Sequence, residues 1–260
     1  MNTLIVSGSP LTIENIFCHA FSVTLEIIRR LSPYYMAVIA ASLLLSQSSG
    51  GLGLATPLLA SIVIAGASCL LILVTTYAAA RIWQGQPIAS TGELFRQIDL
   101  MLIFECAWLF LRVCITSIPL LLLLIIPGLV YIFNRSLAFY CLILRRTTVS
   151  EALTESRELM TCEPWYATNG PQLRLGGLYF ILLLCSVGIG IISLTGSSIH
   201  VVASIWLTED WTRILDWTGA LVDLILRQFF AVFQIAAGVG FYIDMKNRTT
   251  IRSPTIAENR

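Results

Sequence analysis

Amphipathic stretches alternate with long apolar runs along this chain. From Leu11 to Leu31, apolar residues recur at helical spacing and polar residues fill the opposite side. This pattern predicts an amphipathic helix lying in the membrane surface. Apolar runs at 31–47 and 54–83 follow, separated by the turn-forming sequence Ser48-Ser49-Gly50-Gly51. Together they predict a first transmembrane hairpin, with Pro33 in the first turn of its first helix.

A second unit of the same kind begins at Ser90. The sequence Ser90-Thr91-Gly92-Glu93 has the spacing of a capping box, which predicts a helix start. That helix runs into an apolar stretch that continues, through Pro127-Gly128, to Leu144. The hairpin turn could lie at 116–119, which gives two even spans, or at Pro127-Gly128, which gives a long tilted helix and a short one. We favour the second position, with spans at 98–126 and 129–144.

A third unit opens with another capping box. Thr148-Val149-Ser150-Glu151 predicts the start of an amphipathic helix that ends before Pro164. Apolar runs at 175–194 and 219–243 then predict the last two spans. The polar stretch between them carries three tryptophans, Trp206, Trp211 and Trp217. Their amphipathic rings are typical of interfacial anchors, and docking of a partner is the alternative interpretation.

The predicted fold class is therefore all-α: a polytopic membrane bundle of about six transmembrane helices in three hairpins, each preceded by an amphipathic cytoplasmic helix. Residues 1–243 form one integral membrane domain, and residues 244–260 form a polar cytoplasmic tail. Composition agrees, since 57% of the residues are hydrophobic, 12% are charged and the mean hydropathy is +0.82. This composition excludes a nucleic-acid-binding module, a disulfide scaffold and a soluble Rossmann-type enzyme.

The basic residues predict the orientation of the chain. In the six-span arrangement, Arg213 lies on one side with three acidic residues, and twelve Lys and Arg residues lie on the other. The twelve are Arg29, Arg30, Arg81, Arg96, Arg145, Arg146, Arg157, Arg174, Lys246, Arg248, Arg252 and Arg260. By the positive-inside rule both termini are expected in the cytoplasm.

A family resemblance is carried by the segments IPGLVYIFNRSLAFY and RRTTVSEALTESRELM. They resemble a broad group of bacterial six-helix membrane proteins of unknown function, which includes the YciC-like proteins and the membrane domain of some glycerophosphoryl diester phosphodiesterases. The matching positions are Pro127, Gly128, Arg135, Ser136, Glu151, Ala152, Ser156 and Met160. The resemblance implies a six-helix fold and an inner-membrane location. No soluble catalytic domain follows the last span, which puts lipid hydrolysis in doubt.

Charged residues within the predicted spans are the candidate functional residues, because a charge there costs about 2.5 to 3.5 kcal/mol on insertion scales. They are Glu105, Arg112, Arg135, Asp223 and Arg227. Asp223 and Arg227 are four residues apart and can pair directly, whereas Arg135 has Glu105 as its natural partner on the preceding helix. The five could form a polar track for an ion, a proton or an anionic substrate. We favour the other interpretation, neutralising pairs that fix helix register.

Other chemistry finds little support in the sequence. The seven cysteines are scattered, and His19 and His200 have no ligands at metal-binding spacing, so no metal or cofactor is expected. No GxSxG, HExxH, Walker A or GxGxxG motif is present. We therefore expect a non-enzymatic accessory or scaffold subunit whose partners are the bilayer and other membrane-complex subunits, and not nucleic acid. The alternative is a small transporter or lipid-handling protein that uses Glu105, Arg112 and Arg135.

Overall fold

The computed structural model describes residues 11–48, 55–88, 90–162, 170–206 and 208–257. In these ranges the chain forms helices and no strands. The helices are α1 (Ile13–Ser48), α2 (Ala55–Trp83), α3 (Thr91–Arg96), α4 (Leu100–Leu123), α5 (Ile125–Arg135), α6 (Ala138–Arg145), α7 (Val149–Thr161), α8 (Pro171–Trp206) and α9 (Glu209–Ala257).

Within the described ranges, six segments are long and apolar enough to cross a membrane, which confirms the all-α fold class and indicates a multi-pass membrane protein. They are Ile13–Leu45, Leu58–Trp83, Leu100–Leu122, Ile125–Arg145, Pro171–Ile191 and Ile214–Thr249.

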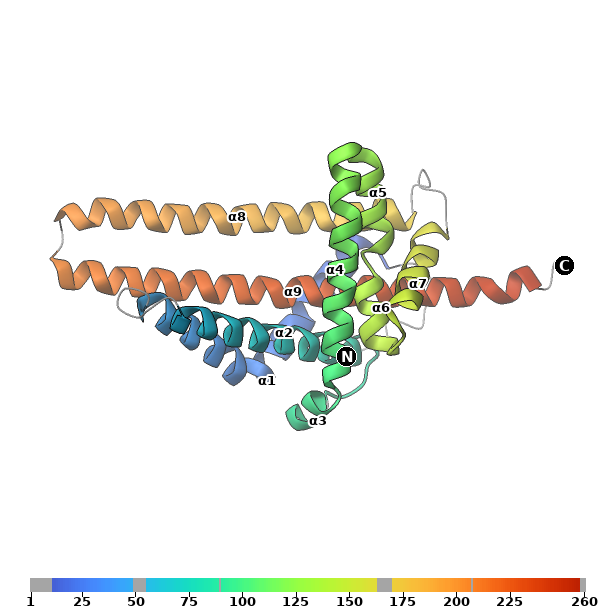
Figure 1. Ribbon diagram of the computed structural model, residues 1–260, viewed down its shortest axis with the longest axis horizontal. Helices are drawn as coiled ribbons and strands as arrows, with labels where there is room; N and C mark the ends of the chain where they lie inside the picture. Colours follow the sequence, from blue (N-terminus) through green and yellow to red (C-terminus); the bar gives the residue numbers. More distant parts are fainter. Residues whose placement is uncertain (1–10, 49–54, 89, 163–169, 207, 258–260) are drawn as a thin grey trace.

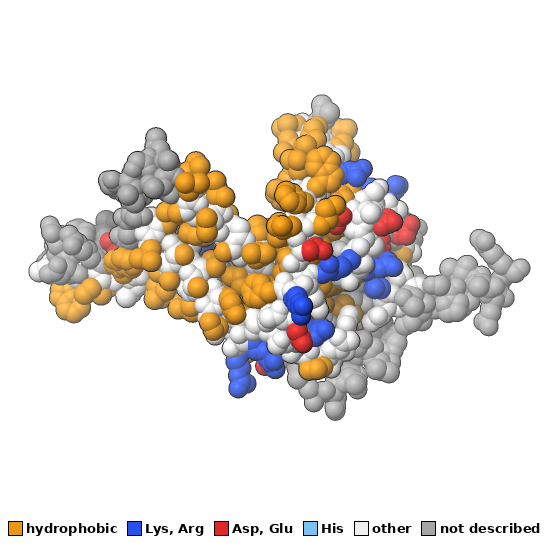
Figure 2. All heavy atoms as spheres, turned by 60° about the horizontal axis from the view of Figure 1, so that its bottom comes forward, with side chains coloured by type: hydrophobic (Ala, Val, Ile, Leu, Met, Phe, Trp, Pro, Cys, Tyr) orange, Lys and Arg blue, Asp and Glu red, His pale blue; other side chains and the backbone are white. Residues whose placement is uncertain are grey.

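The helices form two arms (Figure 1). In the first arm α8 and α9 lie side by side as a long antiparallel pair, and α1 and α2 pack along α9. In the second arm α4 and α5 form a hairpin that crosses α8 near its start at a steep angle and packs against α6 and α7. Figure 2 shows hydrophobic side chains over both arms, whereas most charged side chains on this face gather where the arms meet.

Helix α1 corrects the predicted boundary at Pro33. The structure has one helix from Ile13 to Ser48 with Pro33 inside it, not a surface helix followed by a separate span. Its apolar stripe faces α2 and α9 instead of the membrane surface. The stripe is Ile16, Ala20, Val23, Ile27, Leu31, Tyr35, Ile39 and Leu43, all buried. Because this stripe continues on both sides of the exposed Pro33, packing offsets the roughly 3 kcal/mol that a proline costs within a helix.

The middle hairpin turns at neither predicted position. Leu124 is extended between α4 and α5, so Pro119 lies inside α4 and Pro127 lies in the first turn of α5. Proline has no backbone N–H, and in the first turn of a helix this loses no hydrogen bond, because the N–H groups there have no partner within the helix. Gly128 permits the tight approach of the two helices, because a Cβ atom at this position would lie 2.8 Å from the backbone nitrogen of Leu121.

Both predicted capping boxes are confirmed. Ser90 and Glu93 cap α3, and Thr148 and Glu151 cap α7, each with reciprocal hydrogen bonds. The helix that starts at Ser90, however, does not run into the apolar stretch. It ends at Arg96, and Asp99 caps α4 separately by accepting a 2.9 Å hydrogen bond from the Leu102 N–H.

The C-terminal third is more helical than its polar composition suggests. The predicted polar stretch at 196–218 is occupied by the end of α8 and the start of α9, since it contains no proline to stop a helix. The prediction that residues 244–260 form a polar tail is wrong for the first of these residues. Asp244 and Met245 continue α9 and are buried, with 6% and 1% of their surface exposed.

Candidate functional site

The predicted in-span charges lie on separate helices. Glu105 and Arg112 are on α4, Arg135 ends α5, and Asp223 and Arg227 are on α9. The predicted Asp223–Arg227 pair is confirmed, with 2.8 Å between Oδ2 and Nε. Among the described residues, no hydrogen bond or ion pair connects the α4 charges with Arg135 or with this pair.

Arg135 binds helix backbone and not the predicted partner Glu105. Its Nη1 donates to the carbonyl of Leu153 in α7, and its guanidinium lies 5.7 Å from the ring centroid of Tyr131. A second bond between the same helices runs from Ser156 Oγ to the carbonyl of Asn134, at 3.0 Å. The prediction failed because a carbonyl across a helix interface leaves no pattern in the sequence.

The family-motif residues position the junction of α5, α6 and α7. Ala152, Ser156 and Met160 are spaced by four residues and form one fully buried face of α7. Ser136 Oγ donates to the carbonyl of Phe133 at 2.8 Å, at the break between α5 and α6. With Arg135, these residues hold the α4–α5 hairpin onto α7, which is a structural role.

The tryptophans of the predicted anchor lie beside the α8–α9 turn. Trp211 and Trp217 on α9 are 59% and 41% exposed. Trp206 ends α8, and its side chain lies outside the described residues. The side chain of His200 also lies outside them. His19 packs edge-on against Trp83, with 4.3 Å between ring centroids.

A buried charge cluster that the sequence analysis missed joins the starts of α1 and α8 to the C-terminal half of α9. We call it the arginine cluster and define it as Arg174, Asp244 and Arg248. Asp244 Oδ2 lies 2.9 Å from Arg174 Nη1 and 3.2 Å from Arg248 Nε. The Arg174 and Asp244 side chains are only 7% and 6% exposed.

The arginine cluster also holds the segment that leads into α1. Leu11 donates its backbone N–H to Asp244 Oδ1 at 3.2 Å, and its carbonyl accepts a hydrogen bond from Arg174 Nη2. Arg174 further lies 5.6 Å from the ring centroid of Phe241. The spacing of Asp244 and Arg248 predicts an ion pair on one helix, but the arrival of Arg174 from 70 residues away could not be read from the sequence.

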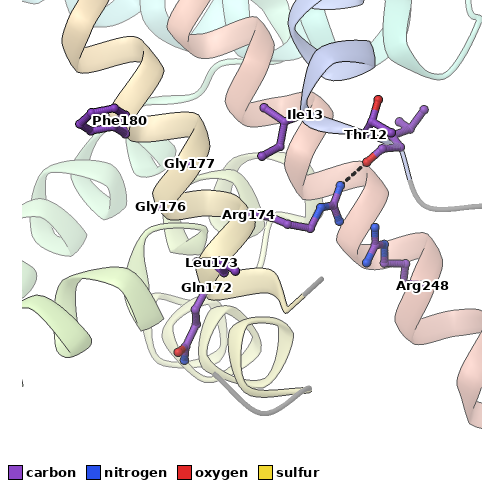
Figure 3. A pocket seen from close by; sticks show the side chains of 10 residues that line it. Thr12, Ile13, Gln172, Leu173, Arg174, Gly176, Gly177, Phe180 and Arg248 are labelled. Atoms are coloured by element: carbon purple, nitrogen blue, oxygen red, sulfur yellow. Dashed lines mark hydrogen bonds between the residues drawn. The ribbon is translucent and has the colours of Figure 1, made fainter. Parts of the chain in front are cut away.

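A pocket of about 760 Å³ adjoins the arginine cluster (Figure 3). Arg174 and Arg248 line its polar end, and the two guanidinium groups reach toward each other from α8 and α9. The rest of the wall is largely apolar and includes Ile13, Leu173 and Phe180. The pocket therefore combines positive charge with an apolar surface.

The described residues contain no group of three or more His, Cys, Asp or Glu side chains that could hold a metal ion. Comparisons with known proteins found no family model, no curated protein and no solved structure that matches this chain. The resemblance to the YciC-like proteins remains a prediction from the sequence.

Proposed function

We propose that this chain is a multi-pass inner-membrane protein that acts as a non-enzymatic accessory or scaffold subunit of a membrane complex. The observation that supports this most is the way its charges are used. Asp223 pairs with Arg227 within α9, and Arg135 binds a carbonyl of α7, so these three charges are engaged by partners inside the protein. A transport path would instead need charges that face one another along a shared polar track.

The α4–α5 hairpin supplies the surface for such a role. Its exposed apolar side chains include Leu100, Phe104, Phe110, Leu122 and Ile126, each at least 70% exposed. The hairpin is attached to the rest of the chain through α6, α7 and the start of α8. Lipid or the helices of a partner subunit would cover these side chains in a membrane.

The charged junction supports a cytoplasmic location for both termini. The basic residues where the two arms meet form ion pairs with acidic residues. Arg145 pairs with Glu155 at 2.6 Å, and Arg146 pairs with Asp99 at 3.3 Å. By the positive-inside rule this side faces the cytoplasm. Fusion of a periplasm-dependent reporter enzyme to the C-terminus should give no activity. An active C-terminal fusion would contradict this orientation.

Substitution separates the scaffold from the alternative, a transporter that uses Glu105, Arg112 and Arg135. Arg135→Ala and Glu105→Gln should each leave the assembled complex detectable on a native gel, with Arg135→Ala slightly weakened because it loses the contact with α7. A transporter would lose solute uptake outright in both variants while its assembly stayed the same. That result would overturn the proposed scaffold function.

A further inference from the structure

The pocket beside the arginine cluster lies where three candidate membrane spans begin or end. Ile13 starts the span on α1, Pro171 starts the span on α8, and Thr249 ends the span on α9. The lining residues Ile13, Arg174 and Arg248 come from these three helices. The pocket therefore lies at the boundary between apolar and polar sequence, where the headgroup of a lipid meets its acyl chain.

The polar end of the pocket carries an excess of positive charge. Arg174 and Arg248 are the charged side chains among the residues that line the pocket, and both contact Asp244, which does not line it. Arg174 and Asp244 are nearly fully buried, and Arg248 is 18% exposed at its side chain. Because buried charges are stabilised by counter-charge, an anion at this end is favoured. Guanidinium groups match the geometry of phosphate oxygens especially well.

The apolar wall continues from this charge along one face of α8. Leu173, Gly176, Gly177 and Phe180 recur at helical spacing and all line the pocket. Leu173 and Phe180 are 57% and 60% exposed, so the wall opens outward. Seven residues of helix span roughly 10 Å, which is the length of several methylene groups.

Gly176 leaves the floor of this face empty. A Cβ atom at Gly176 would meet nothing within 4 Å, whereas one at the neighbouring Gly177 would lie 3.1 Å from the Ile13 side chain. A side chain at Gly177 would therefore crowd Ile13 of α1, whereas Gly176 is open. The surface beside Gly176 can accept an apolar chain without displacing a side chain.

We propose that this pocket binds an anionic phospholipid, with the phosphate at Arg174 and Arg248 and an acyl chain along Leu173, Gly176 and Phe180. Free phosphate could bind the two arginines but would leave the apolar wall unoccupied, so a phospholipid fits the whole pocket better. The site goes beyond the scaffold function and requires only that the chain is embedded in a bilayer. Bound lipid would connect α1, α8 and α9, the same helices that the arginine cluster joins.

The test uses the full chain, purified in mild detergent and stripped of lipid. Its thermal unfolding is followed while three probes are added separately: dioctanoyl phosphatidylglycerol, dioctanoyl phosphatidylcholine and inorganic phosphate. Ligand that binds the folded state raises the melting temperature, and the rise grows with the logarithm of the ratio of ligand concentration to dissociation constant. We expect phosphatidylglycerol to stabilise the wild type at concentrations at least about tenfold lower than phosphatidylcholine, because the choline cation neutralises the headgroup of phosphatidylcholine and repels the two guanidinium groups.

Two variants address the two ends of the pocket. Arg248→Gln removes one positive charge but leaves the Arg174–Asp244 pair in place, and Gly176→Leu fills the apolar floor. Each variant should bind phosphatidylglycerol with an affinity at least about tenfold lower than the wild type. Their controls are Arg157→Gln, an exposed arginine on α7, and Gly188→Leu, a position on α8 outside the pocket where a Cβ also meets nothing within 4 Å. Both controls should bind like the wild type.

Three results would overturn the proposal. Equal effects of phosphatidylglycerol and phosphatidylcholine would show that charge is not recognised. Inorganic phosphate that displaces phosphatidylglycerol, with Gly176→Leu binding both normally, would assign the site to a free anion. Wild-type affinity in Arg248→Gln and in Gly176→Leu would place the lipid elsewhere. The melting temperature without ligand shows whether each variant is folded. None of the three results depends on a partner subunit, so failure here leaves the scaffold proposal standing.

Discussion

Replacement of Asp244 by alanine should destabilise the bundle by about 3–5 kcal/mol, the usual loss when one partner of a buried ion pair is removed. Arg174 is 7% exposed and its Nη1 lies 2.9 Å from the carboxylate, so the substitution leaves its charge buried without compensation. The start of α1 is released as well, because Asp244 also accepts the backbone N–H of Leu11 at 3.2 Å. The double variant Arg174→Leu, Asp244→Leu removes the two most buried charges and leaves Arg248, which is 18% exposed, without the carboxylate, so it should recover part of the stability.

Titration with sodium dodecyl sulfate in mixed micelles, followed by far-ultraviolet circular dichroism, measures these changes. The matched control is Asp223→Ala on the same helix, which breaks the Asp223–Arg227 pair. Arg227 is 64% exposed, so this loss should stay below about 1 kcal/mol. The reasoning would be refuted if Asp244→Ala were no more harmful than Asp223→Ala. It would also be refuted if the double variant were as unstable as the sum of its single changes.

Three further substitutions test the helix contacts, each measured by the same titration. Gly128→Ala should cost about 1–3 kcal/mol, because its Cβ would lie 2.8 Å from the Leu121 backbone, whereas Gly66→Ala, with open space around its Cβ, should be neutral or stabilising. Arg135→Ala should lose about 1–3 kcal/mol by removing a charged donor from the α7 carbonyl. Trp83→Phe should lose about 1 kcal/mol, since its Nε1 donates a 2.9 Å bond to the α9 backbone, and an unchanged midpoint would contradict that contact.

Features that depend only on residues close together in the sequence were predictable. The two capping boxes need only the four-residue spacings at Ser90 and Thr148, and both form as predicted. The six apolar segments follow from run length and composition. Helix breaks were less predictable. Pro33 does not end α1, because the helix packs against its neighbours both before and after this residue. The middle turn falls at Leu124, whose immediate neighbours Leu123 and Ile125 are not turn-forming residues.

The site was less accessible from the sequence than the fold. The four-residue spacing of Asp223 and Arg227 predicted their pair, and the same spacing at Asp244 and Arg248 was available but lay in a segment interpreted as a tail. Nothing in the sequence brings Arg174 to Asp244, since that contact depends on how α8 and α9 pack. The predicted partner of Arg135 was wrong for a similar reason: the acceptor is a backbone carbonyl of α7, and its position depends on how the helices pack.

The most direct test of the scaffold function is purification from native membranes in mild detergent, followed by mass determination and identification of co-purifying chains. The account predicts a complex that contains another membrane subunit in fixed stoichiometry, and loss of that subunit when the exposed α4–α5 side chains Phe104 and Phe110 are replaced by serine. A chain that purifies alone, as monomer or homo-oligomer, and that supports solute uptake abolished by Arg135→Ala would contradict it.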